Sequence, residues 1–281
     1  MNLDEYLIRN TIRIETETQN GTGSGTGFFY EFQIDNSHIP VIVTNKHVIK
    51  DSNIGHLYFS ICNSNGEIIA NDKHRIDITD FEKAWIKHPD DNIDLCIMPI
   101  AQLVEELLSK NINPAYSILT KENIPLSDNI KELSTIEDVT VVGYPDGIWD
   151  SVNNLPIVRK GITATPLKYN FEGNPKFLVD SAIFPGSSGS PVFIYNQGAY
   201  HIGNTLYAGN RLLFVGIIYA VTLHTVTGNI EIIDIPTMNT PLAITQMPNN
   251  LGVAIKAEKL FDFEDILKNM LSKQNKNVNE S

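Results

Sequence analysis

The amino-acid sequence predicts an all-β fold made of two halves and followed by a C-terminal helix. The first observation is a series of short apolar, β-branched runs, each bounded by Asn, Asp, Gly or Pro, which is typical of strands joined by hairpin turns. The second is a helical period at residues 101–110, and the third is an amphipathic helical pattern at residues 257–272. A length of 281 residues with 42% apolar residues is sufficient for one large β domain or two smaller ones.

The first half begins with residues 4–16, which suit either a short helix or a strand. The glycine-rich sequence GTGSGTG follows at residues 21–27. It lacks the Lys-Ser/Thr ending of a phosphate-binding loop, and an apolar strand rather than a helix comes after it, so we expect a turn that feeds a hairpin. Further strands are predicted at residues 39–43, 57–62, 76–78 and 94–100.

A polar segment containing Pro114 and Pro125 connects the two halves. The strands predicted after it are residues 139–142, 157–158, 176–179, 191–194, 212–221, 230–235 and 252–255. The last nine residues, KQNKNVNES, are polar, and we expect them to be disordered. The expected division is a lead-in at 1–20, a first β half at 21–110, a linker at 111–135, a second β half at 136–256, and a helix with a polar tail at 257–281.

Charge and composition exclude several classes of partner. The net charge of -12 repels nucleic-acid phosphates and anionic membrane surfaces, so we expect neither as a partner. The N-terminus MNLDEYLIRN lacks the basic and apolar regions of a signal peptide, and no apolar run spans a bilayer. Cys62 and Cys96 lie in apolar, strand-like runs that favour buried thiols over a disulfide. We therefore expect a cytoplasmic location.

Three segments carry residues with catalytic chemistry. The apolar strand VIVTNKHVI ends in a turn with His47, the strand NIDLCIM is begun by a single acid, Asp94, and the segment DSAIFPGSSGSPVF places Ser188 in a glycine-rich turn. A serine hydroxyl is a poor nucleophile unless a base takes its proton, and the base needs a partner that fixes its tautomer. We therefore predict that Ser188 is the nucleophile, His47 the base and Asp94 its partner.

The glycines beside Ser188 have a separate chemical reason. Acyl transfer builds negative charge on a carbonyl oxygen, and two backbone N–H groups in a tight turn can stabilise it. We expect these donors to be the N–H groups of Gly186 and Ser188. Each of the three catalytic residue types is commonly structural when it occurs alone, and the six other histidines are interpreted as structural. The order His–Asp–Ser in an all-β chain differs from the orders in subtilisin and in α/β-hydrolases.

The chain resembles the bacterial trypsin-like serine peptidases, close to their HtrA and glutamyl-endopeptidase branches. The segments that carry the resemblance run in the family's order: GSGTGFFY, VTNKHVI, DLCIMPI, VVGYP, VDSAIFPGSSGSPVF, FVGIIYA and NLGVAIKAEKL. The resemblance implies two antiparallel six-stranded β-barrels of the chymotrypsin type with the triad between them. His47 and Asp94 would come from the first barrel and Ser188 from the second. The residues after the second barrel are too few for the PDZ domain of the HtrA branch.

The resemblance also places an S1 pocket, which binds the substrate side chain before the cleaved bond. Its residues would be Ala182 at the base, Ile218, Tyr219, Ala220 and Val221 along one wall, and Gly252 and Ala254 at the back. Ala182 cannot supply the acid that Lys or Arg specificity needs, and Ile218 stands where glutamyl endopeptidases have a histidine. Since burying an unpaired charge is costly, we expect small or medium apolar P1 residues. Ser187 replaces the aspartate that pairs with a new N-terminus in many secreted members, so we expect no activation by N-terminal cleavage.

The sequence thus predicts a serine endopeptidase that acts on a protein or peptide substrate through an acyl-enzyme. A free peptidase in cytosol would damage its host, so we expect regulation, with a protein partner as one means. Two alternatives stay open: a catalytically silent binding module with the same fold, and an esterase or acyltransferase that uses the same triad. No cofactor and no metal site are expected, because the sequence has neither an HExxH motif nor a Cys–His cluster.

A long polar loop at residues 145–166 contains Trp149. In the family that the chain resembles, such a loop lies near the rim of the active site, where it gates the oxyanion hole or binds a partner. The alternative is a surface loop on which Trp149 packs down.

Overall fold

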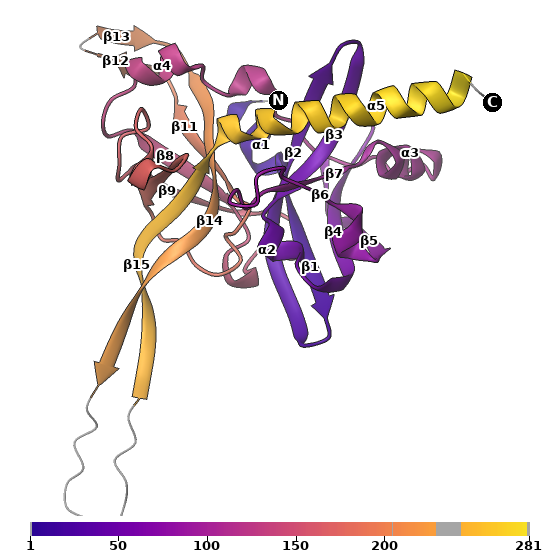
Figure 1. Cartoon of the computed structure of the whole chain (residues 1–281), viewed down its shortest axis with the longest axis horizontal. Coiled ribbons are helices and arrows are strands. Elements are labelled where there is room, and N and C mark those ends of the chain that lie inside the picture. The colour runs from indigo at the N-terminus through magenta and orange to yellow at the C-terminus, as the bar shows by residue number, and fades with distance from the viewer. Residues whose placement is uncertain (1, 204, 229–242, 280–281) are drawn as a thin grey trace, which may run out of the picture.

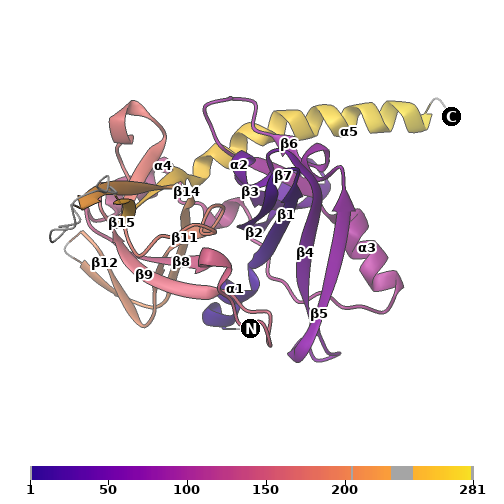
Figure 2. The ribbon, with the colours of Figure 1, turned by 90° about the horizontal axis from the view of Figure 1, so that it is seen from below.

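The computed structural model describes residues 2–203, 205–228 and 243–279 and confirms the predicted all-β class (Figure 1). Two β units lie side by side, and helix α5 (Glu264–Asn279) runs across the first of them (Figure 2). No helix in the described ranges is long and apolar enough to cross a membrane.

The first unit is an antiparallel sheet of seven strands in the order β5-β4-β1-β2-β3-β7-β6. The strands are β1 (Thr11–Thr18), β2 (Gly21–Ile34), β3 (Ser37–Thr44), β4 (Ser52–Cys62), β5 (Ile68–Thr79), β6 (Ile86–Lys87) and β7 (Cys96–Pro99). The expected six-stranded barrel differs from this sheet, which has one more strand and no pairing between β5 and β6 among the described residues. The difference arises because residues 11–18 form β1, which inserts between β4 and β2.

The glycine-rich stretch at residues 21–27 was predicted to be a turn, and this prediction was wrong. These residues begin the long strand β2, which pairs with β1 from Gly21 opposite Thr18 onward. The physical reason is close packing: a Cβ on Gly25 would lie 2.5 Å from Val48 Cγ1, and one on Gly27 would lie 2.7 Å from Ile42 Cγ2. The glycines therefore let the short helix α2 (Lys46–Ile49) lie directly on the sheet.

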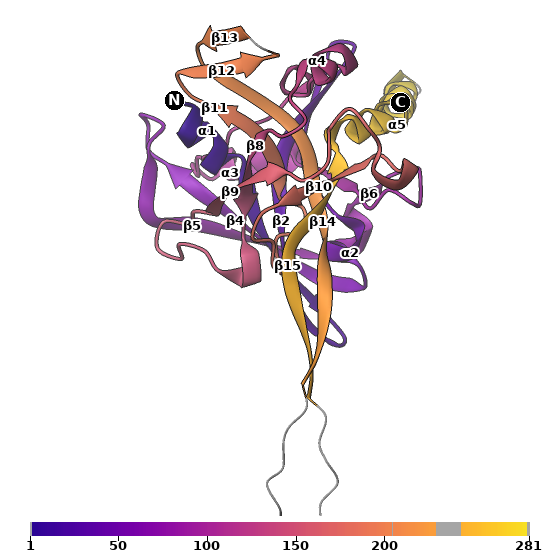
Figure 3. The same cartoon turned by 90° about the vertical axis from the view of Figure 1, so that its left-hand side faces the viewer.

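The second unit is a closed six-stranded barrel, as expected, with the order β10-β15-β14-β11-β8-β9. The strands are β8 (Asp138–Gly143), β9 (Ile157–Thr163), β10 (Lys176–Asp180), β11 (Pro191–Asn196), β14 (Arg211–Gly228) and β15 (Ala243–Lys256). A separate hairpin of β12 (Ala199–Ile202) and β13 (Thr205–Ala208) follows β11. β14 and β15 extend beyond the barrel as a long two-stranded ribbon (Figure 3). The strand predicted at 230–235 lies outside the described residues.

The helices are short except at the C-terminus. They are α1 (Leu3–Arg9), α2, α3 (Ala101–Ser109), α4 (Ser127–Glu132) and α5, with 3-10 turns η1 (Phe81–Ala84), η2 (Lys121–Asn123), η3 (Pro145–Gly147), η4 (Phe171–Gly173) and η5 (Ala257–Phe263). The helix predicted at 257–272 begins as η5 and continues as α5 to Asn279. The tail was predicted to be disordered from residue 273, and this prediction was wrong for residues 273–279, which continue α5.

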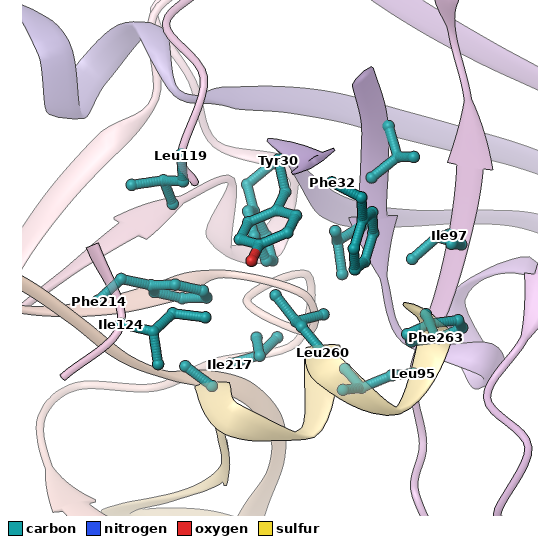
Figure 4. Close-up of a cluster of buried hydrophobic side chains, with 14 of the residues drawn as sticks. Tyr30, Phe32, Leu95, Ile97, Leu119, Ile124, Phe214, Ile217, Leu260 and Phe263 are labelled. Atoms are coloured by element: carbon teal, nitrogen blue, oxygen red, sulfur yellow. The ribbon is translucent and has the colours of Figure 1, made fainter. Parts of the chain in front are cut away.

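One buried apolar cluster joins the two units and the C-terminal segment (Figure 4). Phe28 on β2 packs edge-to-face against Phe214 on β14, with ring centroids 5.2 Å apart. Leu260 and Phe263 of η5 complete the cluster, and Phe263 lies 6.3 Å from the ring of Phe32. Because these side chains come from both units, their burial fixes how the units sit against each other.

Replacing Leu260 with alanine should lower the free energy of unfolding by about 2–5 kcal/mol, because Leu260 is fully buried in this shared cluster. Chemical denaturation measures this change. Leu108→Ala is the matched control, since Leu108 is 50% exposed, and its effect should stay within about 0.5 kcal/mol. Equal effects of the two substitutions would contradict the role given to the shared cluster.

Candidate active site

The first unit brings His47 and Asp94 into direct contact. His47 lies in α2, immediately after β3, and the buried Asn45 donates from Nδ2 to the backbone oxygen of Asp94 at 2.7 Å. The Asp94 carboxylate then binds His47 twice. It accepts the His47 backbone N–H at 3.1 Å, and its second oxygen lies 2.5 Å from the ring nitrogen Nδ1. Both the position and the orientation of the imidazole are thereby fixed.

This contact also determines which ring nitrogen can act as a base. A carboxylate only accepts hydrogen bonds, so Nδ1 carries the proton and donates it to Asp94. Nε2 is then left with its lone pair. The His47 side chain is 45% exposed, so the ring lies partly at the protein surface.

Cys96 follows Asp94 closely but is not a competing nucleophile. Burial, and next the neighbouring Asp94 carboxylate, raises the pKa of the Cys96 thiol well above its usual value. The thiolate rather than the thiol is the reactive form, so Cys96 stays inert. Cys62 and Cys96 are both free cysteines.

In the second unit, Ser188 follows a tight turn. The Ser187 N–H donates to the Phe184 oxygen at 3.0 Å, and Gly186 occupies the third position with φ +84°. These features define a type II turn, in which the third residue needs a positive φ that side chains rarely adopt. Ser187 is buried, and its hydroxyl accepts a hydrogen bond from the Phe184 N–H at 3.4 Å.

The residue after Ser188 is a second constrained glycine. Gly189 has φ +86°, and its N–H donates to the Ile218 oxygen on β14 at 2.8 Å. The Ile218 N–H returns a bond to the Ser190 oxygen at 2.9 Å. A Cβ on Gly189 would lie 1.9 Å from the Thr26 oxygen, so only glycine fits there. The turn is thus held between β14 and β2.

Thr26 on β2 links the two units at this point. Its N–H donates to the Ser188 oxygen at 2.9 Å, and its own oxygen accepts the hydroxyl of Thr44 at 2.7 Å. Thr44 ends β3, three residues before His47. Strand β2 therefore contacts both the Ser188 turn and the end of β3, which leads to His47. Within the described ranges, no hydrogen bond joins the Ser188 hydroxyl to the His47 ring.

The backbone around Ser188 presents two free donors. The N–H groups of Ser187, Gly189 and Ser190 all have acceptors inside the protein. In the part of the chain that the structure describes, the N–H groups of Gly186 and Ser188 have none. These are the two groups predicted to stabilise a developing oxyanion.

The predicted wall residues of the S1 pocket lie on β14 and β15. Ile218 and Ala254 pair across these strands and are buried in the barrel core. Tyr219, Ala220 and Val221 follow on β14 and are partly exposed. Along this predicted wall, the residues therefore change from buried at Ile218 to partly exposed at Val221.

The predicted base and back of the pocket are Ala182 and Gly252. Ala182 is exposed, and its backbone oxygen accepts a hydrogen bond from the Arg159 guanidinium. Gly252 is covered by Ile183, because a Cβ on Gly252 would lie 2.6 Å from Ile183 Cγ1. Ile183 is fully buried, and it fills this part of the barrel with an apolar side chain.

The sequence did not single out three residues that contact the site, Thr26, Thr44 and Ile183, and it placed Arg159 only in the polar loop expected near the site. Thr26 stands within the glycine-rich stretch that was interpreted as a turn, so its strand contacts were not expected. The Arg159 guanidinium packs over the Phe184 ring at 4.8 Å, which links β9 to the turn before Ser188. Only the pairing of distant strands reveals these contacts.

The loop that begins at Pro145 is anchored on the first sheet. Trp149 packs under two cations, with Arg13 and Lys73 each 4.4 Å from its ring centroids, and its ring lies 5.8 Å from Tyr58. These contacts favour the interpretation of Trp149 as a residue packed down on the surface.

Comparison with known proteins gives one family. The family model of the trypsin-like peptidase domain matches residues 25–200. No curated protein matches the sequence significantly.

Solved structures that are similar include an HtrA-type protease with a tripeptide, which has 13% identity, a TM-score of 0.47, and coverage of 92% of this chain and 60% of that chain. A serine endoprotease from Yersinia pestis has 17% identity, a TM-score of 0.46, and coverage of 95% and 66% respectively. A mutant of the tobacco etch virus protease has 14% identity, a TM-score of 0.47, and coverage of 96% and 81%. The chain thus spans 60% of the length of the HtrA-type protease.

Proposed function

Because the chain belongs to the family of trypsin-like peptidase domains, we propose that it is a serine endopeptidase with His47, Asp94 and Ser188 as its triad. The observation that carries the proposal is the double contact of Asp94 with the backbone and ring of His47. This contact leaves Nε2 of His47 as the proposed base. The first unit, which carries His47, is linked to the Ser188 turn by the hydrogen bond from the Thr26 N–H to the Ser188 oxygen.

In the proposed reaction, Ser188 Oγ attacks the carbonyl carbon of the substrate peptide and its proton passes to His47 Nε2. The C=O electron pair moves to the oxygen, and the resulting oxyanion accepts hydrogen bonds from the N–H groups of Gly186 and Ser188. The C–N bond then breaks as Nε2 returns the proton to the leaving amine. Water attacks the acyl-enzyme by the same route and frees Ser188. Asp94 stays ionised and stabilises the imidazolium.

We further propose small or medium apolar side chains at the P1 position of the substrate. The support is the apolar character of the predicted wall on β14, where Ala220 and Val221 are partly exposed. A Lys or Arg side chain at P1 would have to be buried there without a partner, which is costly. The Arg159 guanidinium donates to the oxygen of Ala182 and is a cation at the expected pocket base.

We also propose that the protein has a regulatory protein partner and a reducing, cytoplasmic location. The partner is proposed because an unregulated endopeptidase would degrade proteins of its own compartment. The two free thiols, Cys62 and Cys96, support the reducing location.

A fluorophosphonate probe should label the purified protein, and Ser188→Ala should abolish labelling because the probe reacts with an activated serine hydroxyl. Labelling is measured by intact-protein mass. An unlabelled wild-type protein would favour the silent binding module over the enzyme. Labelling with hydrolysis of esters but of no peptide or protein would favour the esterase or acyltransferase.

Asp94→Asn should reduce kcat by about 10⁴-fold, because an amide can donate to Nδ1 and so hold the imidazole in the wrong tautomer. Steady-state kinetics on a peptide substrate, with Asp90→Asn as the matched control on the same loop, measure the change. A loss of less than about tenfold would remove Asp94 from the triad.

A peptide library should show cleavage after Ala, Val or other small and medium apolar residues. Dominant cleavage after Lys or Arg would overturn the apolar pocket. Dominant cleavage after Glu or Asp would also overturn it, and Arg159→Gln would then show whether that guanidinium recognises the acid.

A further inference from the structure

Thr26 makes two hydrogen bonds to the turn around Ser188 and two to residues of neighbouring segments, Tyr144 and Thr44. Its N–H donates to the Ser188 oxygen at 2.9 Å, and its hydroxyl donates to the Gly186 oxygen at 3.0 Å. The same hydroxyl accepts the N–H of Tyr144 at 3.0 Å, and its backbone oxygen accepts the Thr44 hydroxyl at 2.7 Å. Thr26 is fully buried, so water does not compete for these contacts.

Hydrogen bonds hold three peptide units around Ser188, and the unit between Ser187 and Ser188 is held at its oxygen by the Ser190 N–H at 3.0 Å. The unit between Gly186 and Ser187 is held at its oxygen by Thr26 Oγ1 and at its N–H by the Phe184 oxygen. The unit between Ser188 and Gly189 is held at its oxygen by the Thr26 N–H and at its N–H by the Ile218 oxygen. The units that carry the Gly186 and Ser188 N–H groups are attached to these held units. Thr26 therefore supplies the hydrogen bond to the carbonyl oxygen of two units, the one between Gly186 and Ser187 and the one between Ser188 and Gly189.

The orientation of the Gly186 N–H depends on the type of the turn. A change from type II to type I rotates the unit between Pro185 and Gly186 by roughly 150° and turns this N–H away from its direction in the structure. Such a change requires the backbone at Gly186 to rotate. Because ψ of the third residue is near 0° in both turn types, the Gly186 oxygen keeps its place in this change. The Thr26 hydroxyl binds that oxygen, so it fixes the unit between Gly186 and Ser187, to which the Gly186 N–H is attached.

We propose that Thr26 is a positioning residue for the oxyanion hole, acting through the bond from its hydroxyl to the Gly186 oxygen. The proposal rests on the proposed peptidase function. Thr26 does not touch the substrate. It holds the donors that do, and it sets their distance from the His47 unit through Thr44.

The test replaces Thr26 with valine, which keeps the shape and branching of the side chain and removes the hydroxyl. We expect kcat on a peptide substrate to fall by about 10- to 100-fold, since a misplacement of about 1 Å can cost about 100-fold, while KM changes by less than about twofold. Thr26→Ser keeps a hydroxyl and should restore most of kcat. Thr26→Ala removes the hydroxyl with a smaller side chain, for the case in which the valine variant does not fold.

Thr163→Val is the matched control. Thr163 is also buried, and its hydroxyl likewise accepts a backbone N–H, from Glu137 at 2.9 Å, and donates to a backbone oxygen, of Thr135 at 3.3 Å. Both variants should lose similar thermal stability, but Thr163→Val should keep kcat within about twofold of the wild type, the range allowed for a substitution outside the transition-state contacts.

Three outcomes would overturn the inference: an unchanged kcat in Thr26→Val, an equal loss in Thr163→Val, or no recovery in Thr26→Ser. If the wild-type protein neither reacts with a fluorophosphonate nor cleaves a peptide, the proposed function itself fails. An active wild type with an unaffected Thr26→Val variant leaves that function standing and removes only the role of Thr26.

Discussion

Apolar contact between the two β units is the constraint on which the candidate site depends. His47 and Asp94 belong to the first unit and Ser188 to the second, so no local structure can hold them together. Phe28 on β2 packs on Phe214 of β14, and η5 seals the same cluster with Leu260 and Phe263. Thr26 lies two residues before Phe28, and residues two apart share one face of a strand. The packing of Phe28 on Phe214 and the hydrogen bond of Thr26 to the Ser188 turn therefore lie next to each other on the same face of β2.

The fold class and the catalytic candidates could be predicted from the sequence because both depend on short, local sequence patterns. Short bounded apolar runs indicated strands, and the segments around His47, Asp94 and Ser188 each combine a strand with a chemically specific residue. The prediction for residues 21–27 was wrong because turn propensity is also local, whereas the pairing of β1 with β2 decides the structure. Ile183 over Gly252 and Arg159 beside Ala182 depend on strands far apart in sequence, so composition and spacing could not reveal them.

Glycine serves two different purposes near Ser188. At Gly186 and Gly189 the backbone has φ +84° and φ +86°, and these two turns leave the N–H groups of Gly186 and Ser188 without internal acceptors. Unsatisfied buried or half-buried donors normally cost free energy, so a fold retains them where a ligand or an intermediate will accept the bond. At Gly25 and Gly27 in β2 the chain does not turn, and the value of these glycines is the space that a missing side chain leaves.

That space explains why one strand can serve both halves of the site. Along β2, Gly25 and Gly27 face α2 and the core of the first unit, where a Cβ would collide with Val48 or Ile42. The residues between and after them, Thr26 and Phe28, face the second unit. The alternation of a strand therefore places the helix of His47 against one face of β2 and the turn of Ser188 against the other. A larger residue at Gly25 would displace α2, whereas loss of the Thr26 hydroxyl would remove a contact of the Ser188 turn, so the two faces of β2 separately position the proposed base and the proposed oxyanion donors.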